Sequence, residues 1–298
     1  MERGDIVLAR ITFLEAAKQI QIWENVVFLD ETWLNANQTV GKMWTDNTAH
    51  SSTKVPEGKG ERLIICHAGN AKGFIPNALL AFKSKKTGDY HEEMNADKFE
   101  EWFENNLLNN LTEPSIIIMD NAKYHSRQLN KPPTSQNNKG TLVEWLKKNN
   151  VDADMSMLKE KLVQLVKLHK SPTPTYKLDE MAKERGHRVL RLPPYHCQYK
   201  AIELIWAQIK GYVAKNNMSP PFTANKMLKL LEEASQHVTA ENWKKVVEKT
   251  QKIITDDWNK YIRIDRITDQ QLIIVVGEDS DSDMDTNSDQ ESSSDSDK

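Results

Sequence analysis

Three carboxylates in this sequence stand where they could act together on a phosphate ester. Asp30 closes the apolar run NVVFLD, Asp120 closes IIIMD, and Glu203 follows the first isoleucine of AIELIWAQIK. An unpaired charge at the end of a buried strand is costly, so each aspartate is expected to meet a cation or to cap a loop. Carboxylate oxygens are the ligands that hard divalent cations prefer. Two such ions about 3.5–4 Å apart activate the attacking oxygen and stabilise the leaving oxygen in phosphodiester chemistry.

Local patterns place these carboxylates on defined elements. Asp30 and Asp120 are predicted to end buried strands. Glu203 is predicted in the first turn of a helix, about 100° around the axis from the apolar stripe that begins at Ile202. There it can point toward a cleft, although a solvated helix flank explains a lone glutamate equally well. The predicted strands are 26–30, 41–45, 62–68, 77–83, 116–120 and 187–192, and the predicted helices are 7–23, 95–111, 201–215, 223–236 and 240–259.

Strands that alternate with helices in this order predict a mixed α/β domain. Residues 1–25 are expected to form an N-terminal helix that leads into a core at 26–260. Within this core, loops and amphipathic helices at about 130–186 predict a helical insertion. Residues 261–277 are expected to be a linker or short extended segment, and residues 278–298 a disordered acidic tail rich in Ser and Asp.

Charge is distributed unevenly along the 298 residues. The tail, 278–298, holds nine Asp or Glu and one Lys, whereas residues 1–277 hold 39 Lys or Arg against 34 Asp or Glu. The net charge of −3 therefore hides a body of +5, which permits nucleic-acid contact without requiring it. No apolar run approaches the ~18 residues of a membrane span. The two cysteines, Cys66 and Cys197, are too few and too far apart for a disulfide framework or a structural zinc site.

The residues around the three carboxylates carry a family resemblance. FLDETW, IIIMDNAKYH and LPPYHCQYKAIELIWAQIK resemble the three catalytic motifs of the Tc/mariner superfamily of transposases, over roughly residues 7–260. The resemblance implies a DDE endonuclease domain with an α/β, ribonuclease H-like fold. This fold is a mixed five-stranded sheet flanked by helices, here with the helical insertion and C-terminal helices. It also implies a catalytic, metal-binding triad of Asp30, Asp120 and Glu203.

The same resemblance implies an activity and its partners. Two Mg²⁺ or Mn²⁺ ions per site would support hydrolysis of DNA at transposon ends, followed by attack of the freed 3′ hydroxyl on target DNA. Asn121 and His125 match the Asp-Asn-Ala…His segment of the family and would lie behind the metal ligands or near the DNA phosphates. The implied partners are transposon-end DNA, target DNA and a second copy in a homodimer, without a membrane or a small-molecule cofactor. A DNA substrate implies the nucleus.

Two departures from the family pattern bear on catalysis. Family members usually carry helix-turn-helix domains before the core, whereas here the core begins almost at Met1. Specific recognition of transposon ends is therefore expected to be missing or supplied by another chain. The family often has Asn-Pro before Ile-Glu, where this chain has Lys200 and Ala201. Loss of the proline is expected to loosen the first helical turn, and Lys200 is expected to compete with a metal for Glu203.

Other interpretations of the same residues stay open. A transposase-derived protein without catalysis, retained to bind nucleic acid or protein, is favoured by the two departures, while the intact triad favours an active nuclease and strand transferase. A ribonuclease H-like nuclease that cuts RNA–DNA hybrids fits the motifs less well. Glu31 is expected to cap or to form a salt bridge rather than to bind metal. The adjacent His196 and Cys197 lack an orienting acid at a spacing that would make a nucleophile.

Overall fold

The structure is a computed structural model, which describes residues 3–40, 56–84, 93–171 and 173–272. Met1–Asn259 form one compact unit, and the chain from Lys260 onward belongs to a second. The strand expected around 41–45 and the acidic tail at 278–298 lie outside the described residues.

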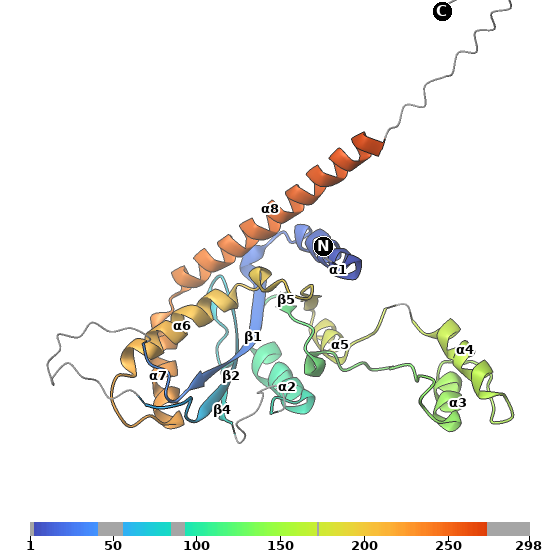
Figure 1. Cartoon of the computed structure of the whole chain (residues 1–298), viewed down its shortest axis with the longest axis horizontal. Coiled ribbons are helices and arrows are strands. Elements are labelled where there is room, and N and C mark those ends of the chain that lie inside the picture. The colour runs from blue at the N-terminus through green and yellow to red at the C-terminus, as the bar shows by residue number, and fades with distance from the viewer. Residues whose placement is uncertain (1–2, 41–55, 85–92, 172, 273–298) are drawn as a thin grey trace, which may run out of the picture. The chain divides into compact units, whose positions relative to one another are not determined.

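Within the described residues, a mixed sheet of six strands lies at the centre of the first unit (Figure 1): β1 (Val26–Asn35), β2 (Arg62–Asn70), β3 (Gly73–Phe74), β4 (Leu80–Lys83), β5 (Ile116–Met119) and β6 (Arg188–Arg191). The order is β3-β2-β1-β5-β6, with β1 antiparallel to β2 but parallel to β5, and β5 parallel to β6. The short β3 and β4 pair with opposite ends of β2, so six strands fill five positions. The expected mixed five-stranded sheet is confirmed.

The helices expected at 95–111, 201–215 and 223–236 begin and end close to those positions, whereas the helix expected at 7–23 lies at Gly4–Lys18 and the one expected at 240–259 continues to Leu272. The predicted helix at 95–111 is α2, prolonged by a π turn (Phe103–Leu107) and a 3-10 turn (Leu108–Asn110). Its start is capped by the Asn95 side chain, which accepts from the Lys98 N–H at 3.0 Å. The described helices are α1 (Gly4–Lys18), α2 (Ala96–Trp102), α3 (Lys139–Lys148), α4 (Lys159–His169), α5 (Lys177–Glu184), α6 (Ile202–Asn216), α7 (Ala224–His237) and α8 (Ala240–Leu272).

Strand β1 continues beyond Asp30, which was expected to end it. The parallel pairing with β5 stops at Phe28 and Ile118, but the antiparallel pairing with β2 runs on to Asn35 and Arg62. Asp30 therefore stands inside a strand, beside the point where β5 has ended. Asp120 directly follows β5, as expected.

Alternation of side chains along β1 divides its neighbours between the two faces of the sheet. Val27 and Leu29 belong to a large buried apolar cluster that includes residues of α2. Phe28 points to the opposite face, where α6 and α7 contact β1. Asp30 shares the orientation of Phe28 and faces the α6 side, while Glu31 faces the α2 side. Two adjacent acids thus reach different environments.

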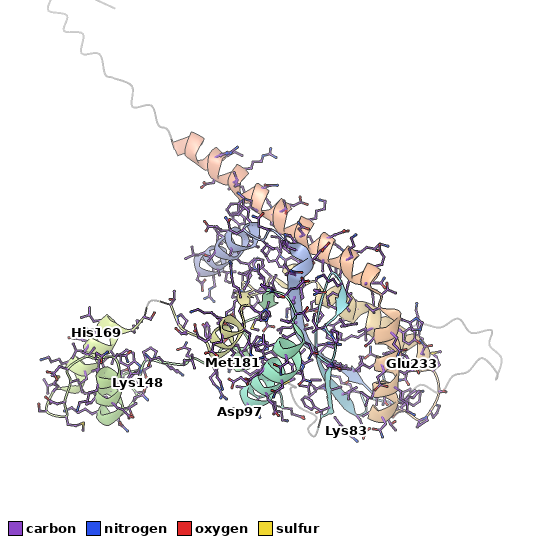
Figure 2. The ribbon with its side chains drawn as sticks, turned by 180° about the vertical axis from the view of Figure 1, so that it is seen from behind. Lys83, Asp97, Lys148, His169, Met181 and Glu233 are labelled. Atoms are coloured by element: carbon purple, nitrogen blue, oxygen red, sulfur yellow. The ribbon has the colours of Figure 1, made fainter. Side chains whose placement is uncertain are left out.

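The helical insertion expected at about 130–186 contains the described helices α3, α4 and α5, which pack in two different ways. Helices α3 and α4, whose ends carry Lys148 and His169 (Figure 2), share a small core of their own that contains Trp145 and Leu162. Helix α5 instead contributes Leu178 and Ala182 to the main core. In α5, as in α4, the buried residues are four positions apart, so the sequence pattern alone did not predict that these two helices join different cores.

The linker expected at 261–277 is wrong over much of its length, because α8 continues to Leu272. Residues 260–272 contain neither glycine nor proline, so nothing in the local sequence ends the helix earlier. Among the described helices, including the long α8, none is both long and apolar enough to cross a membrane.

Candidate active site

The sheet brings Asp30 and Asp120 level with each other. Phe28 pairs with Ile118 across parallel strands, and each aspartate follows two residues later, where β5 has ended. The Asp30 side chain is 8% exposed and that of Asp120 is 39% exposed. The two carboxylates therefore line the boundary between the sheet interior and its open end.

The ammonium of Lys200 lies between these two carboxylates. Its Nζ is 2.6 Å from Asp30 Oδ1 and 3.0 Å from Asp120 Oδ2, and its side chain is 6% exposed. We expected Lys200 to compete for Glu203, but the ion pairs it forms are with the aspartates. The physical reason is burial: Glu203 is exposed, where an ion pair contributes little. A buried carboxylate, in contrast, is strongly destabilising without a partner.

His125 holds Asp120 from the other side. Its Nδ1 donates to Asp120 Oδ1 at 2.8 Å and its Nε2 donates to Glu31 Oε1 at 3.0 Å. Because a carboxylate can only accept, this geometry requires a proton on each ring nitrogen. Burial opposes the positive charge, but Glu31 and Asp120 outweigh it and raise the pKa of His125 to about 9.

Glu31 completes this cluster from the α2 side of β1. It forms the salt bridge with His125, and the Cys66 thiol lies 3.7 Å from the same Oε1. Burial raises the pKa of the Cys66 thiol, and the nearby carboxylates raise it further. Cys66 and Cys197 are both free, Cys66 buried and Cys197 exposed. Glu31 was expected to cap or to form a salt bridge, and it forms a salt bridge.

Burial and neighbouring charges act in opposite directions on the other members of the cluster. Burial raises the pKa of Asp30 to about 7, although Lys200 acts against this. Burial also tends to raise the pKa of Asp120, but the hydrogen bond from His125 and the charge of Lys200 hold it well below its usual range. Burial would lower the pKa of Lys200, yet the two aspartates keep it above its ordinary value. Lys200 therefore stays charged at neutral pH.

Glu203 and Asn121 stand at the rim of this cluster. Glu203 lies in the first turn of α6 and lines a cavity of about 530 Å³ together with Asp120 and Lys200. Asn121 lines the same cavity, and its Nδ2 donates to the carbonyl of Leu192 at 2.8 Å. This hydrogen bond ties the segment after β5 to the end of β6. The structure thus places all five predicted site residues around one region, with Asn121 turned toward the backbone.

Sequence reasoning did not identify the partners of Glu31 and Lys200, which are His125 for Glu31 and the two aspartates for Lys200. Glu31 directly follows Asp30 in a strand, so its side chain had to face the other side of the sheet, where a partner was needed. The signal for Lys200 was its place in the third motif, but its aspartate partners are distant in the sequence and could not be assigned from it.

Residues 25–224 match the family described as DDE superfamily endonuclease. The chain belongs to this family. Among curated proteins, no relative matches the sequence. The solved structures of similar fold include a Mos1 transposase paired-end complex with the left transposon end (14% identity, TM-score 0.54) and the Mos1 strand transfer complex (14%, 0.53). They also include a mariner Mos1 paired-end complex with Mg (13%, 0.53).

Each of these three matches covers 87% of this chain and 63% of the Mos1 chain, so this chain spans less than two thirds of those proteins. At such identities the likeness shows the fold, and the expected ribonuclease H-like fold is confirmed. The family match confirms the DDE endonuclease part of the expected resemblance, and the Mos1 structures, which come from a mariner transposase, share the fold.

The carboxylates of this cluster can bind a cation, but their positions in this structure are those of a site filled by Lys200. The ammonium of Lys200 is itself a cation held between Asp30 and Asp120. The donors are carboxylate oxygens, which suit Mg²⁺ or Mn²⁺. As the side chains lie, however, no three His, Cys, Asp or Glu residues in the described part of the chain are grouped closely enough to hold one metal ion. The two aspartates form the cradle, and Glu203 stands at its rim.

Proposed function

We propose that this DDE domain hydrolyses DNA phosphodiester bonds with the help of divalent metal ions and joins the freed 3′ end to target DNA. The observation that carries the proposal is the meeting of Asp30 and Asp120 around a cation at the open end of the sheet, with Glu203 on the same cavity as Asp120. Three carboxylates from three separate elements converge on one region of a fold shared with Mos1 transposase.

Asp30, Asp120 and Glu203 would hold the ions, either Mg²⁺ or Mn²⁺ and two per site. When bound, such ions polarise the phosphate and activate the attacking oxygen. The role of His125 is positional: it fixes Asp120 Oδ1 and is itself fixed by Glu31. Asn121 keeps the segment after β5 joined to the end of β6, so that Asp120 stays aligned with β1. In this account Glu31 is a support for His125 and not a ligand.

The proposed substrates are transposon-end DNA and target DNA. The Mos1 structures are named as paired-end and strand transfer complexes, and the net charge of +5 on residues 1–277 permits contact with phosphates. A homodimer that holds two DNA ends and residence in the nucleus follow from the same proposal.

The test is nicking of supercoiled plasmid in Mg²⁺ or Mn²⁺ by the wild type and by Asp120→Asn. We expect metal-dependent nicking that Asp120→Asn reduces at least about a hundredfold, because loss of a group that only supports a metal ligand already costs about 10–100-fold, and Asp120 is a proposed ligand itself. Asp152→Asn, an exposed aspartate in the insertion, is the matched control and should nick like the wild type. Metal-dependent nicking that survives in Asp120→Asn would place the activity elsewhere, for example in a contaminant.

A second candidate is a transposase-derived protein that binds nucleic acid or protein without catalysis. The observation in its favour is Lys200, whose ammonium already neutralises the two aspartates. If neither the wild type nor Asp120→Asn nicks DNA, and neither of them binds Mn²⁺, this second candidate replaces the first.

A further inference from the structure

The most unusual feature of the site is that its cradle already contains a cation from the chain itself. Lys200 stands between the 3-10 turn Cys197–Tyr199 and α6, and its side chain reaches back to the sheet. One ammonium contacts an oxygen of Asp30 and an oxygen of Asp120 while remaining almost wholly buried. An ordinary surface lysine contacts one carboxylate and stays solvated, whereas Lys200 contacts two carboxylates and is buried.

We propose that Lys200 is a built-in competitor of the metal ion: its ammonium occupies the cradle in the metal-free chain and must leave before a divalent ion can bind there. The proposal rests on the proposed function, because it concerns the same cradle. It adds that the chain carries its own inhibitor of metal binding, with the affinity for metal set by Lys200.

The competition follows from the oxygens available on Asp120. Oδ2 contacts Lys200, while Oδ1 accepts from His125 Nδ1 at 2.8 Å and from the Ala122 amide at 3.1 Å. Both oxygens are therefore engaged. Mg²⁺ needs its ligands at about 2.0–2.1 Å and tolerates little distortion. An ammonium in contact with the same oxygen would repel the metal ion, because both are positively charged.

Lys200 is the partner that can move. His125 is held at both nitrogens and 1% exposed, so it cannot turn away without leaving Glu31 unpaired. Lys200 has a flexible four-carbon stem and lines the open cavity of about 530 Å³ that Glu203 also lines. The ammonium can therefore swing out into this space when an ion arrives.

The size of the effect depends on how long the ammonium stays in place. A site that is free for only a fraction of the time binds its ligand more weakly by that fraction. If the ammonium occupies the cradle for ~90–99% of the time, replacing Lys200 by a neutral residue strengthens metal binding by about 10- to 100-fold. An effect of this size is easily measured.

The test is calorimetric titration of MnCl₂ into the full chain as wild type, Lys200→Asn and Lys200→Met. We expect both variants to bind Mn²⁺ at least about tenfold more tightly than the wild type. Lys215→Asn, which removes an exposed lysine from the other end of α6, is the matched control and should bind like the wild type. The double variant Lys200→Asn/Asp120→Asn should lose the gain.

Thermal melting with and without Mn²⁺ gives a second readout. It also applies if the loss of Lys200 lowers the stability of a variant, because each form is compared with itself. A ligand that binds only the folded state raises its melting temperature, so Mn²⁺ should stabilise Lys200→Asn and Lys200→Met more than the wild type. Equal Mn²⁺ affinity in wild type and both variants would overturn the competition while leaving the proposed function intact. Tighter binding without nicking by any form would support the competition and refute the nuclease, and no Mn²⁺ binding by any form would refute both.

Discussion

Replacing His125 by phenylalanine should destabilise the folded chain strongly. Phenylalanine keeps a ring against Phe99, whose centroid lies 4.2 Å from that of His125, but it removes both donors. Glu31 is then left with a side chain only 2% exposed and without its cation. Breaking a buried ion pair by removing one partner costs about 3–5 kcal/mol. The raised pKa of His125, about 9, leads to a similar figure, on the order of 3 kcal/mol relative to an unperturbed histidine near 6.5.

Urea unfolding at pH 7, followed by circular dichroism, measures this loss by linear extrapolation. His125→Phe should lower the free energy of unfolding by about 3–5 kcal/mol. The double variant Glu31→Leu/His125→Phe removes the unpaired carboxylate as well, and should be about 2 kcal/mol more stable than His125→Phe alone, since replacing both partners by apolar groups is far less costly. A loss below about 1 kcal/mol, or a double variant that is no better than the single, would show that Glu31 and His125 do not form the pair described above.

Three further substitutions test other parts of the fold. Burial lowers the pKa of His67 to about 3, so the unfolded chain takes up this proton near pH 6.5 while the folded chain does not. Unfolding free energies measured from pH 7 to pH 5 should therefore fall by about 2 kcal/mol more in the wild type than in His67→Gln, and parallel curves would contradict the burial of an uncharged His67. Gly69→Ala would place a Cβ 2.2 Å from Cζ2 of Trp243 and should cost about 1–3 kcal/mol in a urea titration. In the same assay Gly211→Ala, inside α6 with nothing within 4 Å of the added carbon, should stabilise by up to about 1 kcal/mol, and a stabilised Gly69→Ala would rule out the tight contact with Trp243.

The sequence predicted those features of the fold that depend on local pattern. The β-branched, apolar run 116–119 (IIIM) favours a strand by its own composition, and the apolar stripe of α6 indicates which side of that helix is buried. The length of β1 was not predictable in the same way, because its last residues are held by pairing with β2 and not by their own hydrophobicity. The different packing of α4 and α5 was not predictable for a similar reason: both helices have buried residues four positions apart, and only tertiary contacts place them in different cores.

At the site, the sequence could supply the acids but not the balance of charge between them. That Asp30 and Asp120 each need a partner, either a cation or a loop to cap, follows from their places at the end of apolar runs. Which cation they receive depends on contacts across the fold, because the Lys200 ammonium comes from a segment that follows β6. Glu31 shows the same limit, since its partner His125 follows β5.

The buried cluster reads as an alternating series of charges: Glu31, His125, Asp120, Lys200 and Asp30. Each cation lies between two carboxylates, and with three negative and two positive groups the series carries a net charge of −1. A divalent ion added to this series would leave a buried excess of +1, which low-dielectric surroundings penalise. Removal of Lys200 from the cradle changes the series to −2, and Glu203 on the same cavity adds a third negative charge, so the cradle without Lys200 favours the binding of divalent ions. Charge balance therefore supports the proposal that Lys200 and a metal ion are alternatives in the cradle, and on that proposal the affinity for metal changes with the position of this one lysine.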